Sequence, residues 1–157
     1  MIEKANSEHN VRLNDMFPII EEKLKSGGDV IFKPRGVSML PLIRQGLDSV
    51  RVSPVKAEPQ VGDVIFYRRP DGRFVLHRII GRDSLGYILC GDNQWIKEHG
   101  VKLQWIIGVM SAVERDGKAV DVSHPAYLRY VKRLPLRRLK LKLRNIAGKI
   151  KRKIIKR

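Results

Sequence analysis

The feature that most constrains the fold is a succession of short β-rich runs between residues 29 and 122, with turn residues between them. Three of the links, Pro-Asp-Gly at 70–72, Asp-Ser-Leu-Gly at 83–86 and Asp-Gly at 116–117, are typical of β-hairpins. The sequence therefore predicts a mainly β fold, a coiled and largely antiparallel β body. We expect strands at 30–33, 49–52, 63–68, 74–81, 87–90, 105–114 and 119–122.

Helical patterns flank the β body on both sides. Asn14 or Asp15 can cap a short N-terminal helix that has Pro18 in its first turn and ends at glycines 27–28. From residue 136 onward apolar residues recur at helical spacing, which predicts a basic amphipathic helix over 136–157. The chain thus divides into an N-terminal helical segment (1–28), a β domain (29–124) and a basic tail (125–157). The apolar stripe of the tail consists of Leu139, Leu143, Ile146, Ile150 and Ile154.

The positive charge of the chain is concentrated in the tail. Of the 32 Lys and Arg side chains 14 lie in 125–157, whereas all 16 Asp and Glu side chains precede it. A helix with one apolar stripe and cations on its other faces is typical of segments that lie in the headgroup layer of an anionic membrane. Cations alone also bind a nucleic-acid backbone, but that needs no regular apolar face, so we favour the membrane surface. A third interpretation is that part of the stripe packs on the β body.

Several classes of protein are excluded by what the sequence lacks. A single cysteine, Cys90, cannot form an intrachain disulfide, and no Cys-x-x-Cys or His-x-x-x-His spacing indicates a metal site, so we expect no metal and no cofactor. Residues 1–10 lack the apolar core of a signal peptide. The longest uncharged stretch near the centre, 103–113, is shorter than the roughly 20 residues of a membrane-spanning helix. We therefore expect a cytoplasmic protein, held peripherally at the inner membrane face by its tail.

The first segment suited to chemistry is the turn around Ser38. A lone serine stands between Gly36 and Pro41, directly after a predicted strand. Glycine lets the backbone approach a bound carbonyl closely, and proline stiffens the exit from the turn. The hydroxyl of Ser38 would then be exposed with its N–H free, as a nucleophile beside an oxyanion site requires. The simpler interpretation is a serine that only hydrogen-bonds within its own turn.

Two further segments supply a base and an acid. By strand alternation His77 faces the same side as its apolar neighbours two residues away, while Arg78 faces the opposite side. Such an imidazole is either a core histidine bonded to a backbone carbonyl or a base whose pKa is held near neutrality by partial burial. Asp92 lies in a Gly-Asp-Asn turn after the next strand, and Glu98 follows six residues later. Either acid could orient the imidazole.

In this order and spacing the segments resemble the S24/S26 serine peptidases, the superfamily of type I signal peptidases and self-cleaving SOS repressors. The resemblance covers about half the chain, residues 30–114. It implies a signal peptidase-like β fold and a serine endopeptidase. The motifs that carry it are Gly-x-Ser-Met-x-Pro at 36–41, Gly-Asp at 62–63, His-Arg-x-Ile-Gly at 77–81, Gly-Asp-Asn at 91–93 and a closing Ile-Ile-Gly-Val-Met at 106–110.

The resemblance also implies a role for each site residue. Ser38 attacks the scissile carbonyl, and the oxyanion site involves its N–H and Gly36, which lacks the hydroxyl that the family often has there. His77 stands where most of the superfamily has a lysine base. Histidine there is similar to the endoplasmic-reticulum and archaeal signal peptidases, which use a Ser-His pair with a supporting acid. The motif match assigns Asp92 as that acid, with Glu98 as the alternative.

The sequence thus predicts a serine endopeptidase that cleaves an extended peptide or protein segment, as in leader-peptide processing. One alternative is a non-catalytic binding module that uses its basic tail on a membrane surface or on nucleic acid. Another is a regulator that cleaves itself, which we rank last because no helix-turn-helix pattern precedes the β domain. Arg44 and Asp48, which follow Ser38, are expected to be solvated loop charges.

Overall fold

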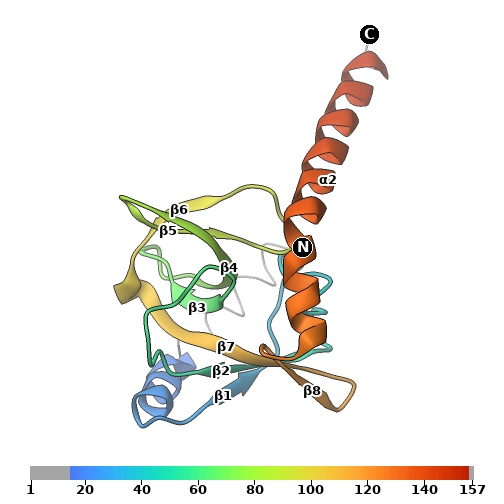
Figure 1. Ribbon diagram of the computed structural model, residues 1–157. Coiled ribbons are helices and arrows are strands. Elements are labelled where there is room, and N and C mark those ends of the chain that lie inside the picture. Colours follow the sequence, from blue (N-terminus) through green and yellow to red (C-terminus); the bar gives the residue numbers. More distant parts are fainter. Residues whose placement is uncertain (1–14, 156–157) are drawn as a thin grey trace.

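The computed structural model describes residues 15–155, and the side chains of residues 15–148. An antiparallel sheet forms the centre, with a short helix (residues 15–25) before it and a long helix, α2 (Pro125–Ile155), after it (Figure 1). The mainly β fold predicted from the sequence is confirmed. The strands are β1 (Val30–Phe32), β2 (Ser49–Ser53), β3 (Val64–Arg68), β4 (Phe74–Asp83), β5 (Gly86–Cys90), β6 (Glu98–Val101), β7 (Ile106–Arg115) and β8 (Lys118–Asp121), with a 3₁₀ turn, η1 (Leu103–Trp105), before β7.

The eight-stranded sheet has the order β1-β2-β7-β3-β4-β5-β6, and β8 pairs with β7. The long strand β7 joins its two halves, because it pairs with β2 on one side and with β3 on the other. β3, β4 and β5 form consecutive hairpins, in which Ile65 lies opposite His77 and Arg78 lies opposite Cys90. This register places adjacent residues of β4, the histidine and the arginine, on opposite faces of the sheet.

Apolar side chains cover both faces, so the two sides of β4 lie in different cores. The larger core contains Met39, Phe66 and Leu76, together with Ile20 and Leu24 from the N-terminal helix and Tyr127 from α2. The smaller core lies on the face of His77. Its buried members are Ile65, Tyr67, Ile79, Tyr87, Leu89 and Val101.

The predicted strands agree with the observed ones to within two residues at each end. The sequence analysis missed β6, because the segment Glu-His-Gly-Val has two ionisable side chains and a glycine in place of a β-branched run. This strand forms because β5 presents an edge to it, with Tyr87 opposite Val101 and Leu89 opposite Glu98. Tertiary pairing therefore brings Glu98 into the sheet.

Helix α2 begins eleven residues before the predicted start at residue 136 and continues through Pro135. A proline inside a helix removes one hydrogen bond and strains the preceding turn. The first half of α2 lies against the β body, where Tyr127 and Leu134 are buried, and this packing offsets the cost of the proline. The second half projects beyond the body (Figure 1). Within the described part of the chain, no helix combines the length and the apolar character needed to cross a membrane.

Candidate active site

The turn that carries Ser38 is held by two anchors. Met39, the next residue, is buried in the larger core. On the other side the backbone N–H of Asn93 donates to the Ser38 carbonyl at 2.7 Å, and the Asn93 amide donates to the Val37 carbonyl at 3.2 Å. Gly36 has φ +98°, a conformation that favours glycine, although a Cβ there would meet no atom within 4 Å. Gly36 therefore allows the backbone conformation of the turn that leads to Ser38, and it is not needed to avoid a steric clash.

Gly91, directly after β5, lies against the serine turn. A Cβ on Gly91 would stand 2.6 Å from the Ser38 carbonyl oxygen, so the turn rests directly on the glycine. β5 pairs with β4, and Cys90 at the end of β5 lies opposite Arg78. The Ser38 turn therefore lies at the end of β5, the strand that pairs with the strand of His77.

Ser38 itself keeps both polar groups available. Among residues 15–148, neither its N–H nor its hydroxyl has a hydrogen-bond partner. The N–H is therefore free to donate to a developing oxyanion, as expected from the sequence. Within the described side chains, the hydroxyl of Ser38 and the His77 imidazole are not hydrogen-bonded to one another.

His77 is a buried imidazole, 7% exposed, with an unpartnered nitrogen. Its Nδ1 atom has no hydrogen-bond partner in the described structure; the other buried side-chain nitrogens without one are the Nε atoms of Arg137 and Arg138. Burial lowers the pKa of His77 to about 4, and the charge of Arg69 lowers it as well, while Glu98 and Asp92 act in the opposite direction. At neutral pH the imidazole is therefore uncharged and able to accept a proton.

Glu98 is the acid that faces His77. Its Oε2 atom lies 4.0 Å from His77 Nδ1, and Tyr67 and Arg69 hold the carboxylate by hydrogen bonds of 2.7 and 2.8 Å. Burial would raise the pKa of Glu98, but the hydrogen bonds from Arg69 and Tyr67 outweigh it and lower the pKa. A carboxylate that stays charged next to an imidazole stabilises the imidazolium formed when the base takes a proton.

Asp92 faces away from His77 and is bound on the opposite face of β4. It forms a bidentate pair with Arg78, with nitrogen–oxygen distances of 2.8 and 2.6 Å. The hydroxyl of Tyr130 donates to it at 3.0 Å, and Arg138 approaches at 3.4 Å. Of the two acids predicted for the site, only Glu98 thus lies within ion-pair distance of the imidazole among the described residues. Asp92 instead supports the turn that ends at Asn93.

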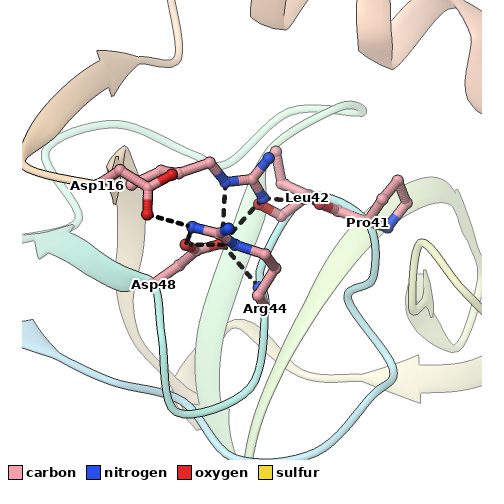
Figure 2. A network of polar contacts seen from close by, with 6 residues as sticks. Pro41, Leu42, Arg44, Asp48 and Asp116 are labelled. Carbon is pink, nitrogen blue, oxygen red and sulfur yellow. Dashed lines mark hydrogen bonds and ion pairs between the residues drawn. The ribbon is translucent and has the colours of Figure 1, made fainter.

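A second polar network stabilises the chain directly after Ser38. Asp48 is fully buried and accepts hydrogen bonds from the side chains of Arg44 and Arg115 (Figure 2). Arg115 also donates to the carbonyls of Pro41 and Leu42, at 2.8 and 2.9 Å. Burial would raise the pKa of the Asp48 carboxyl, but the bonds from Arg44 and Arg115 hold the pKa well below its usual range. The prediction that Asp48 is a solvated loop charge was therefore wrong, because sequence alone does not show burial.

Sequence reasoning missed the residues that hold Glu98, namely Tyr67 and Arg69. A signal for Tyr67 existed, because the alternation that places His77 in the smaller core also places Tyr67 there, diagonally across β3 and β4. An open groove of about 810 Å³ borders Arg69 and is lined in part by Phe17 and Trp105. Its lining includes Arg69 but none of Ser38, His77 and Glu98, so the groove is not part of the candidate site.

Among the described residues, no three His, Cys, Asp or Glu side chains gather in a way that could hold a metal ion. Cys90 is free and buried, and burial raises the pKa of its thiol. Comparisons of the chain with protein-family models, with curated proteins and with solved structures find no match.

Proposed function

We propose that the protein is a serine endopeptidase with a Ser-His mechanism and a β fold of the S24/S26 peptidase type. Ser38 is the nucleophile, His77 the general base and Glu98 the acid that orients and stabilises the base. The proposal departs from the motif match, which favours Asp92 as the acid. It does so because Arg78 already binds Asp92 on the other face of β4.

The observation that carries the proposal is the state of His77. A buried imidazole that serves only the core normally has its nitrogens hydrogen-bonded. Here Nδ1 is unpartnered and faces a carboxylate. The Ser38 turn rests on Gly91 at the end of β5, the strand that pairs with the strand of His77. An uncharged base, an acid beside it and a serine with free polar groups are the groups that acyl transfer requires.

The reaction follows from these positions. Ser38 Oγ forms a bond to the scissile carbonyl carbon as its proton passes to His77 Nε2, and the Ser38 N–H donates to the oxygen that becomes negative. His77 then gives this proton to the leaving amine as the carbon–nitrogen bond breaks. Water attacks the resulting ester, with its proton taken by His77, and the acid product leaves as the serine regains its hydrogen. Glu98 stabilises the imidazolium in both steps.

Covalent labelling tests this proposal directly. A fluorophosphonate probe should label the wild-type chain at Ser38, and a peptide with Ala-x-Ala before the scissile bond should be cleaved. Both signals should disappear in Ser38→Ala, and cleavage should fall by about 10²–10⁴ in His77→Gln, the range typical of a general base. Ser26→Ala and His99→Gln are matched controls, since both side chains are exposed on other parts of the surface.

Equal labelling of Ser38→Ala and wild type would contradict the proposal, as would full turnover in His77→Gln. A wild-type chain that is folded but neither labels nor cleaves would instead support the binding-module alternative. A discrete internal cut in the aged protein, detected by mass spectrometry, would support self-cleavage.

A further inference from the structure

The outward side of α2 carries a row of exposed apolar side chains. They are spaced eight, three, four and three residues apart, so they follow one side of the helix over about 27 Å. Each is about half exposed. The row, which we call the α2 stripe, consists of Leu128 (47%), Leu136 (58%), Leu139 (52%), Leu143 (56%) and Ile146 (45%).

The α2 stripe is not a continuation of the face that packs on the β body. Tyr127 and Leu134 are buried and Val131 packs against the larger core, and these three positions define the docked face of the helix. At 3.6 residues per turn, the stripe lies roughly a third of a turn away from that face. Of the stripe predicted from the sequence, Leu139, Leu143 and Ile146 are exposed and do not pack on the body, while the side chains of Ile150 and Ile154 lie outside the described residues.

Cations surround the stripe, and acidic side chains are absent from the whole of α2. The cations of the docked face are already used, since Arg137 donates to Asn93 and Arg138 to Asp92. The others are exposed; Lys132 lies within the row, between Leu128 and Leu136, and the rest flank it. Those exposed between its first and last members are Arg129, Lys132, Arg133, Lys140, Lys142 and Arg144.

We propose that α2 lies on the surface of an anionic lipid bilayer, with the stripe among the upper acyl chains and the flanking cations among the lipid phosphates. The β body is then held on the far side of the helix, away from the bilayer. A bilayer surface offers acyl chains to the apolar stripe and phosphates to the flanking cations. A nucleic-acid backbone would neutralise the cations but leave the apolar row in water. The proposal goes beyond the peptidase function and uses none of the residues that form its site.

Vesicle sedimentation of the full chain tests this proposal. The protein should sediment with phosphatidylglycerol-containing vesicles, should not sediment with phosphatidylcholine alone, and should bind more weakly at high salt. The triple variant Leu139→Ser, Leu143→Ser, Ile146→Ser should bind at least about tenfold more weakly, because the apolar contribution is lost while the charge is kept. The matched control replaces three exposed apolar residues of the β body, Val61→Ser, Ile96→Ser and Leu103→Ser, and should bind like wild type.

A dye that brightens in apolar surroundings gives a second measurement that does not depend on the triple variant. When the dye is attached to the cysteine of a Leu143→Cys variant, its fluorescence should increase with phosphatidylglycerol vesicles. When it is attached in an Asn145→Cys variant, whose residue is exposed on the opposite side of α2, the fluorescence should not increase. Buried Cys90 does not compete for the label. Equal vesicle binding by wild type and the triple variant would overturn the proposal, and so would binding to a DNA duplex in the absence of vesicle binding. Neither result would affect the peptidase proposal, which is read from Ser38 labelling.

Discussion

The two faces of strand β4 carry opposite kinds of buried polar group, although the residues concerned are adjacent in sequence. On one face Arg78 donates to Asp92, to the Gly62 carbonyl and to the Tyr127 hydroxyl. On the other face His77 has an unpartnered nitrogen 4.0 Å from Glu98. On the first face both charged groups of the Arg78–Asp92 pair are hydrogen-bonded, whereas on the second face the Nδ1 atom of His77 is not.

Under the proposed function, this contrast separates the buried polar groups that stabilise the fold from those that take part in catalysis. The bidentate ion pair between Arg78 and Asp92, which α2 covers, stabilises the turn at Asp92 and Asn93. Through Asn93, whose N–H donates to it, this turn positions the Ser38 carbonyl. An unsatisfied buried imidazole costs free energy, and native proteins retain such groups mainly at functional sites. We therefore expect changes on the Arg78 face to affect stability and changes on the His77 face to affect catalysis.

The largest expected effect is from Asp92→Asn. The change leaves the Arg78 guanidinium buried with no counter-charge, which typically costs about 3–5 kcal/mol of unfolding free energy. Urea denaturation measures this loss. The control is Asp71→Asn, since the pair of Asp71 with Arg73 is exposed and screened by water. A loss for Asp92→Asn as small as that of the control would show that the Arg78 face is not the structural one.

Glu98→Gln should produce the opposite pattern, a large loss of activity with little loss of stability. We expect kcat/KM to fall about a hundredfold or more, because the imidazolium loses its charged partner. Arg69 is part-exposed and can turn to water, and the new amide oxygen can still accept from Tyr67, so the loss of stability should be smaller than that of Asp92→Asn. A stability loss equal to that of Asp92→Asn, with normal kcat/KM, would reverse the assignment of the two faces.

The pH dependence of kcat/KM tests the role of the His77 face of β4. His77 acts in its uncharged form, so kcat/KM should be level from pH 7 downward and fall only as the pH passes through about 4, the pKa of His77. The negative charge of Glu98 raises that pKa, so its removal in Glu98→Gln should move the midpoint to lower pH. A midpoint near 6.5, the ordinary value for histidine, would contradict the burial of the base.

Gly91→Ala should have an intermediate effect on both properties, because Gly91 lies against the serine turn at the end of β5. The new Cβ would stand 2.6 Å from the Ser38 carbonyl oxygen, so the serine turn must move. We expect a loss of about 1–3 kcal/mol in stability, as for other overpacked sites, and a clear fall in kcat. Gly148→Ala is the control, since a Cβ there meets nothing within 4 Å. A Gly91→Ala variant with normal kcat would mean that the position of the turn is not critical.

The strands and hairpins were predictable because their signals are local, as in the Asp-Gly turn at 116–117 between β7 and β8. Which acid lies beside His77 was not predictable. Asp92 and Glu98 are both close to the end of β5 in sequence, and the choice between them depends on strand β6, which forms only by pairing with β5. The early start of α2 was also not predictable from the sequence, because Pro135 normally ends or kinks a helix. Only docking of the helix against the β body offsets the cost of the proline.

The smallest and most closely matched comparison uses one tyrosine on each face. Tyr130 donates to Asp92 at 3.0 Å and Tyr67 donates to Glu98 at 2.7 Å, so replacement by phenylalanine removes one hydrogen bond to a carboxylate in each case. Each change should cost about 1–2 kcal/mol of stability. Only Tyr67→Phe should also alter kcat/KM and its acid midpoint, because it releases Glu98 from a bond that lowers the pKa of that carboxyl. Thermal denaturation and pH profiles of both variants measure this, and an equal effect of the two on kcat/KM would show that the faces of β4 are not separate in function.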